Sequence, residues 1–360
     1  MIHLRLIDAI EAGCVEHGIP FEAVRTAGDL MRTDVKTLTL DDTVKTSLDL
    51  MQACRIRHVP VLDMPRDGED KPVFIGVISQ RDVLRLKTPD AGAADKDDPC
   101  PKALRQLLAR VVTRDPVTVG PLTPIREAIT LQIGNHIDML PVLQQETLVG
   151  LITATDFLRL LTKVGKHLAE AVARQNGDLT AAEGASAQLR TLSARTVQDC
   201  MVRQVVCLTE QDTLTRAIEL LKKQRFRHLP ILDEGNRLAG IVSDRDILRH
   251  LPYAGPRPPR TSREFRADLF RVGPRTRNLD LRMADVMTRN VHAVSPDTGI
   301  FDAAETLLRQ KVSCLPVLDA DRTVCGILTQ TDLLRLLSTI YEGPAAAGPV
   351  PRQARVPSRR

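Results

Sequence analysis

The chain carries one short pattern of apolar and polar positions four times. In each copy a glycine is followed by two apolar residues, a serine or threonine, two variable residues and an aspartate. The four glycines are Gly76, Gly150, Gly240 and Gly326. An apolar run containing Pro-Val-Leu or Pro-Ile-Leu precedes each copy, and an apolar-Leu-Arg segment follows it. The same order in all copies identifies an internal repeat.

The pattern predicts the same elements in every repeat. A short β-branched stretch comes first, followed by a helix with apolar residues at helical spacing, as at Val44, Leu48 and Met51. Two strands follow, and a second helix begins beside the aspartate. The first helices are expected to start near hydroxyl residues suited to N-capping, which are Thr43, Thr123, Thr213 and Thr298. The predicted fold class is α/β (α+β), with four β-α-β-β-α units.

One such unit buries too little surface to be stable alone, so neighbouring repeats should pair into two modules. Composition along the chain sets the expected boundaries: an N-terminal segment 1–26, repeats 27–88 and 103–165, a linker 166–195, a repeat 196–251, an Arg/Pro-rich insert 252–282, a repeat 283–341 and a basic tail 342–360. The modules are expected to pack face to face, either within one chain or in a homodimer.

Composition narrows the class of protein. The apolar fraction of 43% in 360 residues can fill the cores of two or three domains. No apolar run approaches the roughly twenty residues that a bilayer requires, so we expect a cytoplasmic protein with no membrane partner. The seven cysteines lack zinc-site spacing and are odd in number, which argues against a metal site and a disulfide framework.

These repeats resemble cystathionine-β-synthase (CBS) domains. Four of them in two pairs resemble two Bateman modules, similar in layout to the γ subunit of AMP-activated kinase. The resemblance implies a regulatory fold that binds adenosine-containing ligands in clefts between paired repeats. It implies that the aspartate takes the ribose hydroxyls, that the serine or threonine lies near the phosphate, and that the adenine lies against the partner repeat.

General chemistry is consistent with those roles. One carboxylate can accept both ribose hydroxyls in charge-assisted bonds, a helix N-terminus suits a phosphate, and a glycine permits close backbone approach. The alternative is that Ser/Thr-x-x-Asp only caps the second helix, since both residue types are good caps. For any single copy both interpretations stay open.

The copies differ in their basic residues. Repeats 1 and 3 have an arginine before the aspartate and an Arg-His pair before the Pro-Val/Ile-Leu strand, so their clefts should prefer a phosphorylated nucleotide. For the first cleft the candidates are Arg57, His58, Ser79, Arg81 and Asp82, with Thr118 and Met139 from repeat 2. For the second they are Arg227, His228, Ser243, Arg245 and Asp246, with Ala293, Ser313 and Cys314 from repeat 4. Weaker candidates in repeats 2 and 4 are Thr153, Asp156, Thr329 and Asp332.

Asp138 sets the first cleft apart. A second carboxylate near a phosphate costs binding energy unless it faces the adenine amine or a metal. We therefore expect fewer bound nucleotides than repeats, with the strongest binding at Asp246. An alternative for His58 and His228 is that they are partly buried packing residues at the start of a strand.

Outside the repeats, the sequence shows no nucleophile and no acid-base pair suited to catalysis. The prediction is therefore a non-enzymatic regulatory protein without a catalytic cofactor. Its ligand would be AMP, ADP or ATP, and it would act on an unidentified partner protein; S-adenosylmethionine, NAD or a cyclic dinucleotide stay open. One alternative is a ligand-free scaffold for an enzyme, kinase or transporter. Another is a nucleic-acid binder that uses the arginines of 257–282 and the tail, but seven phenylalanines, two tyrosines and no tryptophan offer few stacking platforms.

Overall fold

The computed structural model describes residues 24–64, 72–87, 102–174, 192, 194–224, 226–250 and 281–340. The N-terminal segment up to residue 23, the linker from residue 175 to 191, the insert up to residue 280 and the basic tail lie outside these described residues, as does the arginine-rich surface proposed for nucleic acid.

Each repeat contains a helix, an antiparallel strand pair and a second helix, which confirms the predicted fold class. Repeat 1 has α3 (Val44–Ala53), β2 (His58–Asp63), β3 (Val73–Ser79) and α4 (Gln80–Lys87). Repeat 2 has α5 (Ile125–Asn135), β5 (Met139–Gln144), β6 (Thr147–Thr153) and α6 (Ala154–Arg174). Repeat 3 has α8 (Leu214–Gln224), β8 (His228–Leu232), β9 (Leu238–Ser243) and α9 (Asp244–His250). Repeat 4 has α11 (Ile300–Arg309), β10 (Cys314–Leu318), β11 (Val324–Thr329) and α12 (Gln330–Ile340).

Short strands extend these hairpins. β1 (Leu38–Thr39) runs parallel to β2, and β7 (Leu208–Thr209) runs parallel to β8. In repeats 2 and 4 the same place is taken by single parallel bridges, from Val119 to Val142 and from Val294 to Val317. Helix α6 continues to Arg174, past the point where the sequence predicted a linker to begin.

All four first helices begin within two residues of the expected threonines, but only two of these threonines cap them. Thr43 and Thr213 do cap α3 and α8, with their hydroxyl oxygens 3.1 and 3.4 Å from the amides of residues 46 and 216. Thr123 and Thr298 do not, because α5 and α11 begin two residues later. Their hydroxyls instead accept from the amides of residues 120 and 295, at 3.0 and 3.1 Å, in the preceding turn.

Paired repeats exchange the segments that come before their first strands, here called lead segments. The lead segments of repeats 1 and 3 contain α2 (Ala27–Leu30) and η4 (Val197–Asp199). Those of repeats 2 and 4 contain η2 (Lys102–Arg105), η3 (Leu108–Arg110) and β4 (Thr113–Arg114), and α10 (Met283–Val286). Arg32 exchanges backbone hydrogen bonds with Leu151 of repeat 2 at 2.8 and 2.9 Å. Val202 exchanges the same pair of bonds with Ile327, and Thr288 exchanges them with Ile241. In repeat 2 the lead segment contributes β4, which pairs with β3 of repeat 1. Each lead segment therefore lies on the sheet of the other repeat in its module.

This exchange explains the four motif glycines. Each lies directly opposite an apolar strand residue, just before a bulge in the register, as Gly76 lies opposite Val61. A Cβ on Gly150, Gly240 or Gly326 would collide with a methionine of the lead segment beside it, and one on Gly76 would collide with the Thr113 carbonyl. These glycines therefore allow the lead segment of the partner repeat to approach the strand backbone closely.

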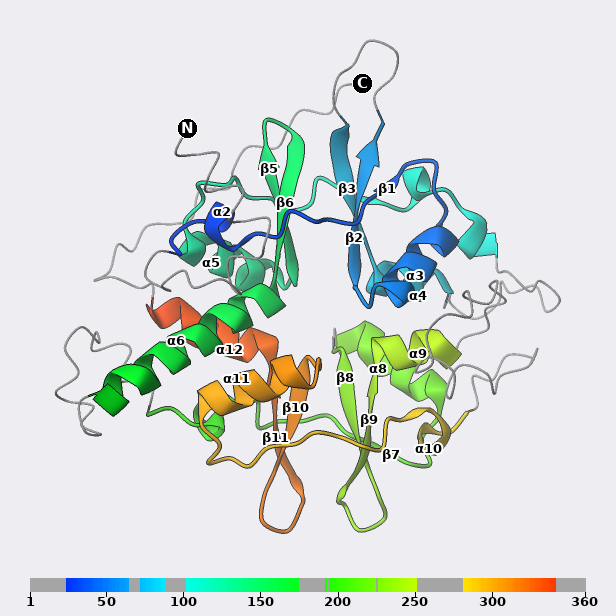
Figure 1. Ribbon diagram of the computed structural model, residues 1–360. Coiled ribbons are helices and arrows are strands. Elements are labelled where there is room, and N and C mark those ends of the chain that lie inside the picture. The colour runs from blue at the N-terminus through cyan, green and yellow to red at the C-terminus, as the bar shows by residue number, and fades with distance from the viewer. Residues whose placement is uncertain are drawn as a thin grey trace.

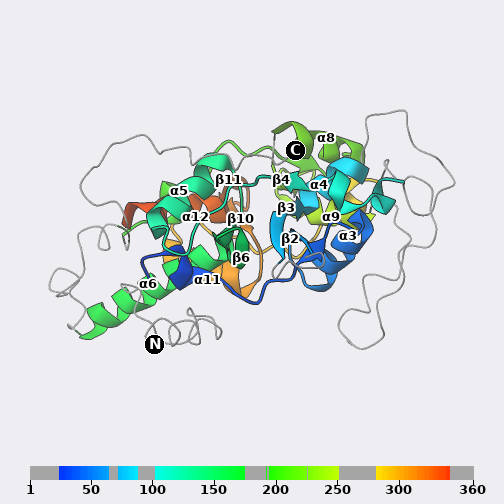
Figure 2. The same ribbon diagram turned by 90° about the horizontal axis from the view of Figure 1, so that it is seen from above.

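The two modules pack through their helices, while the strand hairpins point outward on both sides (Figure 1). One hydrophobic cluster joins repeats 2 and 4, and the other joins repeats 1 and 3. Seen from above, these two pairings occupy opposite halves of the molecule (Figure 2). Face-to-face packing of the modules within one chain, one of the two expected arrangements, is therefore confirmed.

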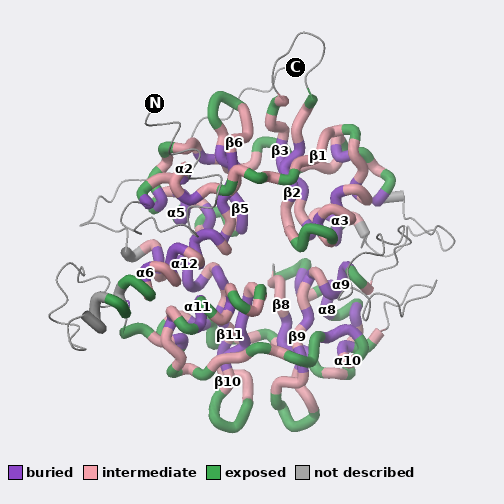
Figure 3. Tube along the Cα trace, viewed as in Figure 1, coloured by how far each residue is buried: buried purple, intermediate pink, exposed green. Residues whose placement is uncertain are grey.

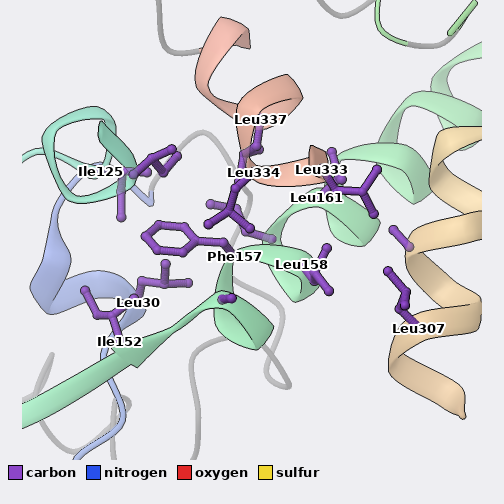
Figure 4. Packing of buried hydrophobic residues seen from close by; sticks show 14 of the residues in the cluster. Leu30, Ile125, Ile152, Phe157, Leu158, Leu161, Leu307, Leu333, Leu334 and Leu337 are labelled. Carbon is purple, nitrogen blue, oxygen red and sulfur yellow. The ribbon is translucent and has the colours of Figure 1, made fainter. Parts of the chain in front are cut away.

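Burial follows this packing. Buried residues lie along the helices and inner strands, whereas the tips of the β5–β6, β8–β9 and β10–β11 hairpins are exposed (Figure 3). Figure 4 shows Phe157, Leu158 and Leu161 of α6 against Leu333 and Leu337 of α12, and all five are fully buried. Among the described helices, none is both long and apolar enough to cross a membrane.

Candidate functional site

The Ser/Thr-x-x-Asp motif has one geometry in all four repeats. The Oδ2 atom of the aspartate accepts the hydroxyl of the preceding serine or threonine at 2.6 Å and its backbone amide at 2.9 Å. The capping interpretation therefore holds for one carboxylate oxygen in every repeat. A ligand would have to use the other oxygen, Oδ1.

In repeats 2 and 4 that second oxygen is already engaged. Asp156 Oδ1 accepts from Arg32 Nε at 2.7 Å and from Arg159 Nη1 at 2.8 Å. Asp332 Oδ1 accepts from Arg335 Nη1 at 2.8 Å, and burial raises the pKa of Asp332. These contacts support the interpretation of both carboxylates as structural.

In repeats 1 and 3 the second oxygen is more open. Asp82 Oδ1 lies 3.8 Å from Arg85 Nη1, and Asp246 Oδ1 lies 3.4 Å from Arg249 Nη1. The Asp82 and Asp246 side chains are 21% and 13% exposed, against 3% and 5% for Asp156 and Asp332. Asp82 thus keeps an oxygen accessible to a ligand, whereas Asp246 Oδ1 already accepts a long hydrogen bond from Arg249.

A cavity of about 380 Å³ lies beside Asp82, between repeats 1 and 2. Clefts of this size commonly bind small molecules. The sequence candidates that line it are Arg57, His58, Ser79, Arg81, Asp82 and Met139. Thr118 is not among the lining residues, although its neighbour Val117 is. The structure therefore brings together most of the set proposed for the Asp82 cleft.

Repeat 3 completes this cavity, which the sequence did not indicate. Arg227 and Asp244 lie in its wall, and Arg227 Nη1 forms an ion pair with Asp138 Oδ2. The sequence assigned Arg227 to the Asp246 cleft. The difference arises because repeat 3 packs against repeat 1, so the residue before β8 reaches across the module interface to repeat 2.

Arg57 of repeat 1 reaches across the module interface in the opposite direction. Its Nη1 donates to Ser313 Oγ of repeat 4 at 3.3 Å, and its Nη2 lies 3.5 Å from Gln330 Oε1. His228 Nε2 lies 2.9 Å from the same Ser313 oxygen. Ser313 precedes β10 as Asp138 precedes β5, so each arginine meets the equivalent position in the opposite module. His228, Ser313 and Arg57, which come from repeats 3, 4 and 1, therefore meet at the module interface.

Positively charged side chains crowd one another at the centre of the molecule. Burial, together with Arg57 and Arg81, lowers the pKa of Arg227 to about 9. Burial and the guanidinium groups of Arg57, Arg227 and Arg81 lower the pKa of His58 to about 3. A protein sustains this repulsion only where structure holds the groups together, and a bound anion would relieve it.

A model of the CBS domain matches residues 27–88, 108–163, 197–253 and 283–339, which together make up more than half of the chain. The chain belongs to the CBS-domain family. Its four repeats are thus CBS repeats, in the tandem arrangement that the motifs predicted.

Known structures and sequences agree with this assignment. The crystal structure of MJ1225 from Methanocaldococcus jannaschii, described as a candidate archaeal homologue of γ-AMPK, superimposes with a TM-score of 0.62 at 19% identity, covering 87% of this chain and 99% of that chain. That similarity shows the fold. A 33.4 kDa protein from a ribosomal RNA operon of Thermofilum pendens is 24% identical over 291 residues, which are 79% of this chain and 82% of the relative.

An enzyme also contains related sequence. Inosine-5'-monophosphate dehydrogenase of Thermoplasma acidophilum is 25% identical over 289 residues, which are 78% of this chain and 50% of that enzyme. Half of the enzyme therefore has no counterpart in the match, and the similarity concerns the CBS repeats.

Several lining residues were missed by sequence reasoning, namely Gln80, Asp115, Asn135, His136 and Asp244. Gln80 and Asp244 follow the motif serines, where the repeat alignment could have located them. Gln80 is buried, and its Oε1 has no hydrogen-bond partner among the described residues. Asp115 and His136 both have positive φ angles, 50° and 53°, in turns whose path the pattern did not indicate.

Within the described part of the chain, no group of three or more histidine, cysteine, aspartate or glutamate side chains is placed to hold a metal ion.

Proposed function

We propose that this CBS protein is a non-enzymatic regulator that binds an adenosine-containing nucleotide in the Asp82 cavity and a second one in the Asp246 cleft. The observation that carries the proposal is the composition of the Asp82 cavity. An open carboxylate oxygen, an apolar wall and a cluster of guanidinium groups from both modules line one space of nucleotide size.

Each part of the ligand has a matching surface. Val117, Ile137 and Met139 supply apolar contact for a purine ring. Asp82 Oδ1 supplies an acceptor for ribose hydroxyls. Arg57 and Arg81 supply the paired donors that match phosphate oxygens. AMP, ADP and ATP all share these three groups.

The cavity also suggests how binding would be transmitted. Its wall includes Arg227 of the second module, so a ligand there touches both modules at once. We infer that occupancy strengthens the module interface, and that a partner protein senses this change on the outer surface. The cytoplasmic location and the partner's identity stay predictions of the sequence.

The test compares two equivalent substitutions. Asp82→Asn keeps a carbonyl oxygen for the cap on Ser79 but replaces the acceptor at Oδ1 by a donor. Loss of two charge-assisted bonds of about 1.5–3 kcal/mol each should weaken AMP binding at least about tenfold at this cavity, measured by titration calorimetry.

Asp156→Asn is the matched control, because its Oδ1 is already engaged by Arg32 and Arg159. It should lower the melting temperature and leave AMP affinity near that of the parent. If Asp82→Asn melts and binds AMP like the parent, the aspartate is only a cap and the proposal is wrong.

A further inference from the structure

The charged groups around the Asp82 cavity are nearly balanced, although its arginines cluster. The lining guanidinium groups are Arg57, Arg81 and Arg227, and the lining carboxylates are Asp82, Asp115, Asp138 and Asp244. His58 adds no charge near neutral pH, because its pKa is lowered to about 3. In a cavity with this charge balance, binding is not expected to strengthen as the negative charge of the ligand increases.

Of these carboxylates, Asp138 is the one expected to affect phosphate binding most. It is buried, at 9% exposure, and its ion pair with Arg227 takes up one of the three guanidinium groups. A phosphate that approaches Arg227 must displace this tethered carboxylate or lie beside it. In either case the repulsion grows with each added phosphate, and it is weakly screened because the pair is buried.

The second module provides an internal comparison. There the position equivalent to Asp138 is Ser313, whose neutral hydroxyl accepts from Arg57 at 3.3 Å. At this position Arg57 therefore meets a neutral group, although the charge of Asp244 also acts on it. The two clefts therefore differ in formal charge at this position, as they also do where Asn290 replaces Asp115 and Lys311 replaces His136.

We propose that Asp138 is the specificity-determining residue of the Asp82 cavity, limiting its ligand to an adenosine monophosphate in preference to a triphosphate. The proposal rests on the nucleotide binding inferred above. Because Ser313 carries no charge, the Asp246 cleft lacks this limit. The two clefts of one chain would therefore prefer ligands of different charge.

The experiment measures the ratio of the dissociation constants of ATP and AMP by calorimetry in magnesium-free buffer. The full chain carries Asp246→Asn, so that the second cleft contributes little. Two variants are then compared, Asp138→Asn and Asp115→Asn, each of which removes one negative charge from the same cavity wall.

In the Asp246→Asn chain, AMP should bind at least about tenfold more tightly than ATP. Asp138→Asn should lower that ratio about tenfold or more, since Arg227 then becomes available to the added phosphates. Asp115 is exposed, so its removal should change the ratio by less than about threefold. Asp138→Ser, which copies the residue found in the second module, should act like Asp138→Asn and decides the matter if Asp138→Asn does not fold.

Three results would overturn the inference: a chain that prefers ATP, an unchanged ratio in both Asp138 variants, or an equal change in Asp115→Asn. The last result would mean that total charge alone sets the preference. If neither AMP nor ATP binds before Asp138 is changed, in the parent as well as in the Asp246→Asn chain, the proposed function itself is wrong, and the inference falls with it.

Discussion

The imidazole of His228 and the hydroxyl of Ser313 meet at 2.9 Å between Nε2 and Oγ, and they join repeat 3 to repeat 4. Burial and the guanidinium groups of Arg57, Arg227 and Arg245 lower the pKa of His228 to about 4, against the opposing effect of Asp244. His58 lies at the equivalent position of repeat 1 and is still harder to protonate. Both rings are therefore neutral in the folded protein near neutral pH.

Stability should fall as the solution is acidified below about pH 6.5. An unfolded histidine takes up a proton near pH 6.5, whereas folded His228 and His58 do so only near pH 4 and pH 3. The unfolded state thus binds more protons in this window, at a cost of up to about 1.4 kcal/mol per pH unit for each histidine. Urea unfolding between pH 7.5 and pH 5 measures the slope.

His228→Gln is the control for that slope. It should remove one histidine's share of the pH dependence while keeping a polar group near Ser313. A parent protein equally stable at both ends of the range would contradict the picture of two neutral, buried imidazoles.

Two glycine substitutions should have opposite effects on stability. Gly76→Ala places a methyl group against the Thr113 carbonyl, which is backbone and cannot easily move, so a loss of at least about 2 kcal/mol is expected. Gly134 is an exposed residue of α5, and no atom lies within 4 Å of the position that an added methyl group would take. Gly134→Ala should therefore add about 0.5–1 kcal/mol. Thermal unfolding of the two variants provides the test, and equal melting temperatures would refute it.

The shared cores predict that the modules open together. Phe157→Ala in repeat 2 should cost about 3–5 kcal/mol, because its ring is fully buried against repeat 4. Cys314 of repeat 4 is also buried, and its pKa is raised by burial, so it reacts with thiol reagents only after opening. Labelling of Cys314, followed by mass spectrometry, should therefore accelerate in the Phe157→Ala variant.

The exposed Cys54 is the internal reference for reagent concentration. If Phe157→Ala lowers overall stability but leaves Cys314 labelling unchanged, the two modules unfold separately.

The sequence predicted the features that repeat, because they are local. The four motif aspartates, the strand pairs and the difference between Asp82 and Asp156 all follow from patterns a few residues long. The crossing of Arg227 to Asp138 could not be predicted in this way, because it depends on which repeats pack across the module interface. The packing of the lead segments, in contrast, is visible in the sequence. A methionine recurs at Met31, Met201 and Met287, two residues after an aspartate, and these methionines fill the space above three of the motif glycines.

The exchanged lead segments determine which piece of this chain can be transplanted. A cut between repeats 1 and 2 would leave β6 without its contact to Arg32 and β3 without β4, so each fragment would carry away a lead segment that the other needs. A single repeat is therefore a unit of sequence, whereas the smallest unit that could be inherited, shuffled or grafted into another protein is a pair.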